Sequence, residues 1–147
     1  MQLETMPRVP TREQIERLQA EMANLPQVQL PTEHLFVGGM YCRKMSLPKD
    51  LLVVGKVHRH AHFFILAAGQ MIVWTEQGMR TLLAGDVVCS GPGTKRVLLC
   101  LTDCIGMNVH KTDKTDIDEI ERELIEPDEA ALFDARNELK KDLLPCS

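Results

Sequence analysis

The middle of this 147-residue chain, from Leu30 to about His110, is a series of short apolar runs separated by turn residues. About eight runs follow one another at intervals of eight to twelve residues, without a helical pattern between them. Turns are predicted at Pro48-Lys49-Asp50, Gln77-Gly78, Gly91–Lys95 and Thr102-Asp103. Short strands joined in this way favour an antiparallel sandwich or barrel, so we expect a mainly β domain.

A helix is predicted before the strands. Thr11 is a favourable N-cap residue, and Gln14 three residues later completes a capping box. The apolar stripe that follows at helical spacing consists of Ile15, Leu18, Met22 and Leu25. Pro26 ends this pattern. Such a stripe packs either on its own domain or on a neighbouring subunit, and the pattern fits both.

Two further helices are predicted after the strands, where the composition becomes strongly charged. Thr115 is a plausible N-cap for the first, which Pro127 ends, and the second is expected from Asp128 to about Leu143. Their apolar stripes are Ile117, Ile120 and Leu124, and then Ala131, Leu132, Ala135, Leu139 and Leu143. The predicted organisation is thus an N-terminal helical arm (1–29), a β-barrel (30–112) and a C-terminal helical segment (113–147).

Composition limits the partners and the compartment. A formal net charge of -4 and a pI near 5.7 argue against nucleic-acid binding. We expect no membrane partner, because no apolar run reaches transmembrane length, and the N-terminus lacks signal-peptide features, which predicts a cytoplasmic protein. The odd number of cysteines, without a CxxC pair, predicts buried reduced thiols. They are Cys42, Cys89, Cys100, Cys104 and Cys146.

Histidines gather in the stretch "GKVHRHAHFFILAAG", where His58, His60 and His62 occupy alternate positions. Alternate side chains of a strand share one face, so these three and His110 from a later strand could all face the barrel interior. Converging neutral imidazoles suit Zn, Fe, Ni or Cu. The four histidines are the predicted ligands of one transition-metal ion. Alternatively, they are hydrogen-bonded at the barrel mouth and hold no metal.

This stretch, followed by "LAGDVVCSGPGTKR", resembles the two sequence motifs of the cupin superfamily, a family of jelly-roll barrels. The resemblance implies a metal site of three histidines and one glutamate. Alignment on Gly69, which keeps the turn, places His62 at the glutamate position, His58 at the second histidine and Lys56 at the first. Alignment on His58 and His60 as the histidine pair instead places the glutamate position at residue 64 or 65.

The second motif departs from the family pattern in the same direction. Gly85 and Gly93 match the family glycines, whereas Arg96 occupies the position of the third metal-binding histidine. Cations at this position and at Lys56 oppose the charge of a metal ion. The resemblance therefore supports the barrel more strongly than the metal site.

Flanking segments extend the resemblance to a group of small cupin-like proteins encoded by tailed bacteriophages and prophages. The segments are "EMANLPQVQLPTEHLFVGGMYCRKMSLPKDLLVVGKVHRHAHFFIL", "PGTKR" and "NVHKTDKTDIDEIERELI". The resemblance covers roughly residues 11–126 and implies a cupin fold and a phage origin, with the protein in the host cytoplasm or in the virion. It implies no particular activity.

The residues provide little for catalysis. The chain shows no nucleophile with a base beside it, and Glu76 and Asp86 lie at predicted turns or strand ends. We therefore predict a non-enzymatic assembly or accessory module, a virion component that forms a homo-oligomer through its helical arms and contacts other virion proteins. The alternatives are a metal-dependent cupin enzyme, an oxidoreductase or isomerase, and a binding protein for a sugar-like small molecule that uses His58, His60 and His62.

Overall fold

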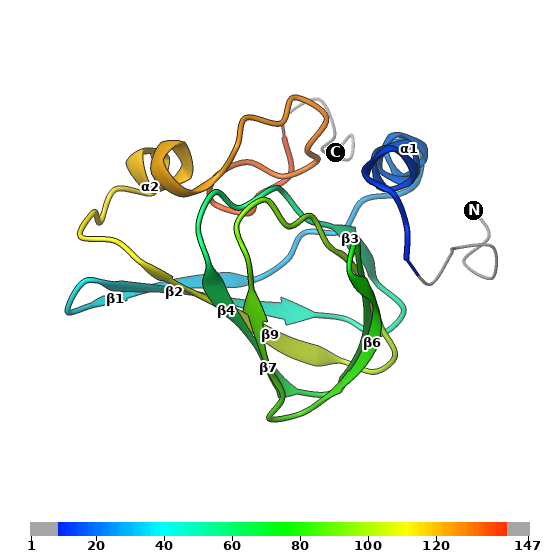
Figure 1. Cartoon of the computed structure of the whole chain (residues 1–147), viewed down its shortest axis with the longest axis horizontal. Coiled ribbons are helices and arrows are strands. Elements are labelled where there is room, and N and C mark those ends of the chain that lie inside the picture. The colour runs from blue at the N-terminus through cyan, green and yellow to red at the C-terminus, as the bar shows by residue number, and fades with distance from the viewer. Residues whose placement is uncertain (1–8, 141–147) are drawn as a thin grey trace.

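The computed structural model describes residues 9–140 and shows two antiparallel sheets that enclose one interior, as Figure 1 shows. The five-stranded sheet has the order β1-β2-β9-β4-β7, and the four-stranded sheet has the order β3-β8-β5-β6. The strands of the first sheet are β1 (Thr32–Val37), β2 (Met40–Leu47), β4 (His62–Ala68), β7 (Val87–Ser90) and β9 (Cys104–Lys111). Those of the second are β3 (Leu52–Val54), β5 (Gln70–Thr75), β6 (Gly78–Leu83) and β8 (Val97–Cys100). The predicted mainly β barrel is confirmed.

The turns lie close to their predicted positions. The β5–β6 hairpin turns at Glu76-Gln77, one residue before the predicted Gln77-Gly78, and Thr102-Asp103 separates β8 from β9. The run that begins at Thr32, however, forms two strands, because Gly38 and Gly39 both take positive φ angles and turn the chain back as a hairpin. The described residues therefore contain one more strand than expected.

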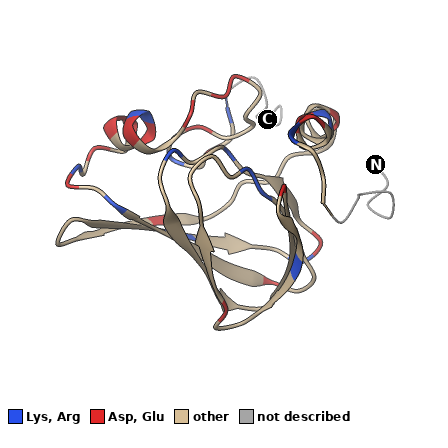
Figure 2. Ribbon diagram, in the orientation of Figure 1, with Lys and Arg blue, Asp and Glu red and all other residues tan. Residues whose placement is uncertain are grey.

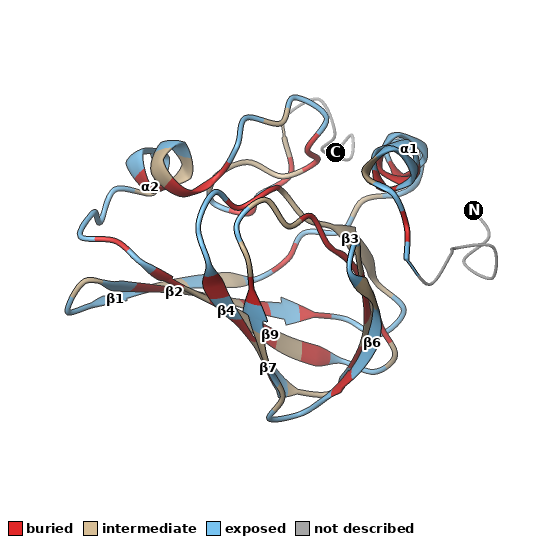
Figure 3. Ribbon diagram, in the orientation of Figure 1, coloured by how far each residue is buried: buried red, intermediate tan, exposed pale blue. Residues whose placement is uncertain are grey.

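The barrel core lies between the two sheets, in the half away from the helices. Its buried members include Leu47 and Leu66 from one sheet and Met71 and Leu82 from the other. Buried residues alternate with more exposed ones along β9, and Figure 3 shows buried and exposed positions alternating along ribbons of the barrel. Alternation of this kind is the pattern of a sheet with one packed face.

Helix α1 (Arg12–Met22) begins as predicted, with Thr11 as N-cap and a complete capping box with Gln14. The Ile15, Leu18 and Met22 side chains are buried in a cluster with Trp74 of the four-stranded sheet. The apolar stripe of α1 thus packs on the chain's own barrel. The helix ends at Met22, so Leu25 lies beyond it and is exposed.

Helix α2 (Ile117–Leu124) begins one residue later than expected. Its N-cap is Asp116, whose side chain accepts a hydrogen bond from the Glu119 backbone N–H. Ile120 and Leu124 pack with the buried Tyr41 of β2. Figure 1 shows that α1, α2 and the C-terminal segment all lie at the same end of the barrel.

The predicted helix from residue 128 is wrong for residues 128–140, which form turns and an isolated bridge between Phe133 and Leu139. The Asp128 carboxylate accepts a hydrogen bond from the Ala130 backbone N–H, and the Asp134 carboxylate accepts from two backbone N–H groups that follow it. Such local bonds compete with helical ones and favour turns. Asn137 also has a positive φ of 62°. Residues 141–143 of the predicted helix lie outside the described residues.

The cysteine prediction is confirmed only in part. Cys100 and Cys104 are buried, whereas Cys42 is half-buried and Cys89 is exposed on β7, because their strand positions place them on the outer face of the five-stranded sheet. Cys146 lies outside the described residues. Neither described helix has the length and the apolar character that crossing a membrane requires.

Candidate functional site

Strand pairing places polar side chains in two adjacent rows on the inner face of the five-stranded sheet. Tyr41 of β2 lies opposite His110 of β9, and His62 of β4 lies opposite Ser90 of β7. One step deeper, Arg43 lies opposite Asn108, which in turn lies opposite Phe64. The next row is mainly apolar, with Met45, Gly106 and Leu66. The inner face is thus polar near the helices and apolar in the depth of the barrel.

His58 reaches the same place from a loop. The segment 55–61 is not part of a strand, and His58 forms an isolated bridge with Ile125 just after α2. The His58 carbonyl accepts a hydrogen bond from the Gly93 N–H at 2.8 Å, and the Arg59 N–H donates to the Leu124 carbonyl at 2.7 Å. These bonds hold the loop between the end of α2 and the turn before β8.

Three buried imidazoles converge at this position: His58, His62 and His110. One ring nitrogen from each lies within 4.8 Å of the other two. His58 Nδ1 and His110 Nε2 are 3.1 Å apart, and the three rings are stacked with centroid separations of 4.1 to 4.9 Å. His110 Nδ1 is buried and has no hydrogen-bond partner in the part of the chain that the structure describes. This cluster joins residues that are up to 52 positions apart in the chain.

Burial keeps these imidazoles neutral. It lowers the pKa of His62 to about 4 and the pKa of His110 to about 3, and it lowers the pKa of His58 well below its usual value. For His58 and His110, the positive charges of Arg43 and Arg96 add to this effect. At neutral pH the cluster therefore presents unprotonated nitrogen atoms, which is the form that binds metal ions.

His60 does not join the cluster. Its side chain is exposed, because the chain around it is a loop in which alternate residues do not share a face. Its backbone carbonyl lies 3.1 Å from His62 Nδ1 and accepts a hydrogen bond from it when that nitrogen is protonated. This bond orients the His62 ring and directs Nε2 toward the interior.

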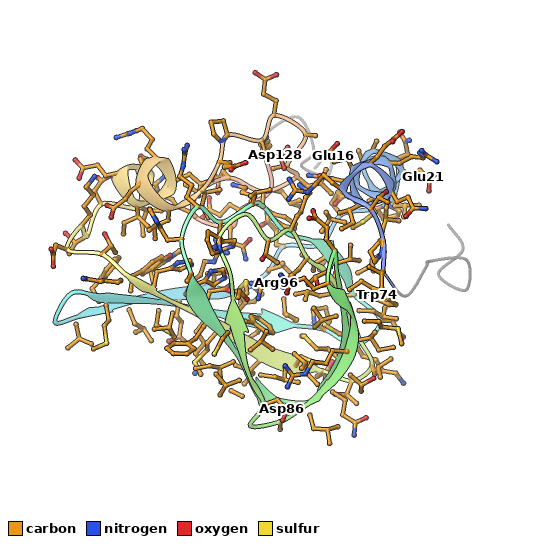
Figure 4. All side chains as sticks on the ribbon, in the orientation of Figure 1. Glu16, Glu21, Trp74, Asp86, Arg96 and Asp128 are labelled. Carbon is orange, nitrogen blue, oxygen red and sulfur yellow. The ribbon has the colours of Figure 1, made fainter. Side chains whose placement is uncertain are left out.

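Arg96 is buried in the barrel interior, at the place labelled in Figure 4. Its guanidinium donates to Ser90 Oγ at 2.8 Å, to Asn108 Oδ1 at 2.9 Å and to His62 Nε2 at 3.2 Å. It also lies over the Phe64 ring, 4.7 Å from the centroid. Burial, together with the nearby Arg43, lowers the pKa of Arg96 to about 10, so it remains charged at neutral pH.

A cavity of about 70 Å³ lies beside these groups. Its polar lining includes Arg43, Lys56, His58, Arg96 and Asn108, and its apolar lining includes Leu30, Val53, Leu98 and Phe133. Figure 2 shows basic segments on the loops at this end of the barrel, below α2 and the C-terminal segment. Residues 131–134 and Asn137 also line the cavity, so the C-terminal segment forms part of its wall.

The three imidazoles fit a transition metal as a donor set. Two nitrogen atoms that bind one ion at about 2.1 Å lie about 3 Å apart, which matches the His58–His110 separation. The His62 Nδ1 contact with a carbonyl is the usual orienting contact of a metal-binding histidine. However, Arg96 donates to the His62 nitrogen that would bind the ion. His58 Nδ1 and His110 Nε2 share a hydrogen bond with each other, and a bound ion would replace it.

Sequence analysis missed Arg43 and Asn108 as members of the site. Arg43 shares its phase along β2 with the buried Tyr41 and Met45, so a charged residue in a buried phase was the available signal. Asn108 likewise lies on the same face of β9 as the buried Gly106, two residues earlier. Lys56, which aligned with a family histidine, instead forms an ion pair with Glu121 of α2 at 2.7 Å.

Comparisons with known proteins identify the fold. No family model and no curated protein matches the sequence. Among solved structures, the cupin domain of Cnp3 from Schizosaccharomyces pombe aligns with a TM-score of 0.51 and 17% identity, covering 66% of this chain and 72% of that chain. KdgF from Halomonas sp. aligns with a TM-score of 0.52 and 14% identity, covering 60% and 83%.

A third structure, that of the plu4264 protein from Photorhabdus luminescens, aligns with a TM-score of 0.52 and 10% identity, covering 67% of this chain and 88% of that chain. These likenesses concern the backbone, because identity is low throughout. The chain has the fold of a cupin barrel.

Proposed function

We propose that this chain is a small-molecule-binding cupin barrel in which His58, His62 and His110 hold one transition-metal ion. The observation that carries this proposal is the convergence of three buried imidazole nitrogens within 4.8 Å. Bound there, the ion would supply Lewis acidity to an oxygen atom of a ligand in the cavity. Burial lowers the pKa of the imidazoles and keeps the three rings unprotonated. Helix α2 covers the side of the cluster where Tyr41 lies, because Ile120 and Leu124 pack on the Tyr41 ring.

Elemental analysis of the purified full chain tests this proposal. We expect close to one Zn, Fe, Ni or Cu ion per chain, and loss of most of it in a His58→Ala, His110→Ala double variant. The His60→Ala variant is the matched control, because His60 is exposed in the same loop and should retain the metal. A wild-type protein that remains metal-free after incubation with each of these ions, while still folded, would contradict the proposal.

A second candidate, an assembly module, is favoured by the outer face of the five-stranded sheet. Large apolar side chains are exposed there on four strands: Leu35, Val37, Met40, Phe63 and Val87. Exposed apolar patches of this kind mark interaction sites. We propose a second copy of this chain as the occupant. The face carries Glu33 and Lys44 at paired positions, so a two-fold arrangement can bring each next to its opposite charge on the partner.

In this proposal the two copies meet through the sheet face and not through the helical arms expected from the sequence. The apolar stripe of α1 is buried in its own barrel, as are Leu132 and Leu139, whereas the sheet face is free among the described residues. The formation of an oligomer stays a prediction. The resemblance to phage-encoded proteins is what supports a place in a virion, which mass spectrometry of particles purified from cells that carry the gene would test.

Light scattering during size-exclusion chromatography tests the dimer. We expect twice the chain mass for the wild type and a monomer for Phe63→Glu, which places charge in the middle of the patch. Met79→Glu is the control, because Met79 is exposed on the other sheet and the variant should remain a dimer. A wild-type monomer at all concentrations up to the millimolar range would refute this candidate.

A further inference from the structure

The most unusual group in the barrel is the guanidinium of Arg96, which is buried and has no anionic partner among the described residues. Its hydrogen-bond partners are a hydroxyl, an amide oxygen and a neutral imidazole. Buried charges in proteins are normally paired, because the loss of hydration costs several kcal/mol per ion. Within residues 9–140 no carboxylate forms an ion pair with Arg96.

A second guanidinium adds to this charge. Arg43 lies directly opposite Asn108 in the sheet, and Asn108 is bonded to Arg96, so the two arginines border the same inner row. Arg43 Nε is buried and has no hydrogen-bond partner within residues 9–140. Both side chains line the 70 Å³ cavity. Two like charges in one enclosed space repel each other, and one unused donor remains there.

The other charged groups near the cavity are already committed. Lys56 is paired with Glu121 at 2.7 Å, which neutralises both. Asp134 also borders the cavity, but its Oδ1 accepts hydrogen bonds from the backbone N–H groups of Arg136 and Glu138, each at 2.9 Å. The nearby imidazoles are neutral. The Asp134 carboxylate keeps its negative charge and offsets one of the two guanidinium charges of Arg43 and Arg96. The cavity wall therefore retains one positive charge that no lining carboxylate balances.

We propose that the barrel binds a small ligand through an oxyanion, a carboxylate or a phosphate group, that lies between Arg43 and Arg96. Guanidinium groups match the geometry of both anions and bind them with two hydrogen bonds. The cavity volume is that of about five water molecules, which suits such a group. Leu30, Leu98 and Phe133 would contact the apolar remainder of the ligand.

This inference deepens the proposed small-molecule function and rests on it, because the ligand would occupy the same barrel as the metal ion. It does not require the metal, since the arginines are charged whether or not the histidines bind an ion. The two proposals therefore fail separately when anion binding is measured on chelated protein and metal content is measured independently.

Thermal unfolding and isothermal titration calorimetry on the full chain, treated with chelator and held at constant ionic strength with chloride, test the inference. We expect malonate or inorganic phosphate to raise the melting temperature and to bind saturably, and the neutral analogue malonamide to do neither. Saturation by malonate alone identifies a carboxylate ligand, and saturation by phosphate alone identifies a phosphate ligand.

Variants separate binding from structure. Arg43→Met should weaken anion binding at least tenfold and raise the melting temperature of the ligand-free protein, because it removes the repulsion and the unused donor. A merely structural arginine would change that temperature in the opposite direction. Arg80→Met is the control, since Arg80 is exposed on β6 outside this cavity and should bind the anion like the wild type.

Several results would overturn the inference. These are the absence of saturable binding of both anions, equal binding by Arg43→Met and Arg80→Met, or equal stabilisation by malonamide. Arg96→Gln should also abolish binding, and the Arg43 variant carries the test if that protein does not fold. Binding that persists in the metal-free His58→Ala, His110→Ala variant would support the anion site even if the metal proposal fails.

Discussion

At the scale of single residues, the site depends on groups that lose or keep their charge through burial. His62 and His110 lie in the outer polar row of the sheet, and His58 reaches them from a loop. Each has a lowered pKa because the interior disfavours its protonated form. Arg96, in the same interior, remains charged because its intrinsic pKa is so high. The barrel thus combines neutral bases with fixed cations.

Acid should destabilise the protein through these histidines. An unfolded histidine binds a proton near pH 6.5, whereas His62 and His110 in the folded chain do so at about pH 4 and 3. Since the unfolded state then holds more protons, this contribution to the free energy of unfolding is present above pH 6.5 and is lost as the pH falls toward 4 and 3. Urea denaturation at intervals from pH 7 to 4.5, with chelator present, measures the slope.

The His110→Gln variant should show a flatter pH dependence, because it removes one of the groups that protonate on unfolding. His60→Gln is the control and should follow the wild type, since His60 is exposed. Identical slopes in all three proteins would show that burial of the cluster does not set the acid sensitivity.

At the scale of elements, the turn between β4 and β5 packs closely against the start of β9, and this contact fixes the position of β4, which carries His62. Gly69, between β4 and β5, has a φ of 89°, and a Cβ atom there would lie 2.3 Å from the Asp103 carbonyl oxygen. The Gln70 N–H and the Cys104 thiol form hydrogen bonds across the same junction. This junction joins the two sheets, and β4 carries His62 away from it.

Gly69→Ala should therefore lower the free energy of unfolding by about 2 to 4 kcal/mol, because it adds backbone strain to a clash with backbone. Gly91→Ala is the matched control: a Cβ there meets nothing within 4 Å, and its φ is not in the left-handed region. Chemical denaturation of both variants measures the difference. Equal stabilities would mean that the β4–β5 junction relaxes freely.

Elements also show how far local sequence patterns lead. The α1 capping box and the β5–β6 hairpin were predictable, because each depends on residues a few positions apart. The predicted helix over 128–140 was wrong, although its apolar spacing is helical. There Asp128 and Asp134 bond to their own backbone, and Lys95 on the barrel holds the segment. Tertiary contacts outweighed a weak helical preference.

At the scale of the whole molecule, the C-terminal segment closes the end of the barrel that contains the site, as Figure 1 shows. An ion pair between the buried Lys95 and the half-buried Asp128, at 3.0 Å, ties it to the barrel, and Gln19 of α1 donates a hydrogen bond to the same carboxylate. Burial by itself would raise the pKa of Asp128, but the hydrogen bonds from Lys95 and Gln19 together lower it. One carboxylate thus joins α1, the barrel and the segment.

Asp128→Asn should cost about 3 kcal/mol, because it leaves the Lys95 ammonium buried without a counter-charge. Hydrogen exchange of residues 128–140 should become faster at the same time, which mass spectrometry can detect. Asp118→Asn breaks an exposed pair with Arg136 and should lower the free energy of unfolding far less than Asp128→Asn does, because water screens both partners. Equal effects of the two variants would show that the Lys95–Asp128 pair does not hold the segment.

The sequence by itself determined the local structure of most segments: the short alternating strands, the turns between them, and the N-terminal helix with its cap. These features depend on neighbouring residues, whose geometry is local. Only the tertiary structure decided that His58, His62 and His110 meet while His60 faces solvent, and that Arg43 lies beside Arg96 through Asn108. Pairing of strands far apart in the chain arises because the whole barrel buries its apolar faces together, and no local pattern specifies that partner.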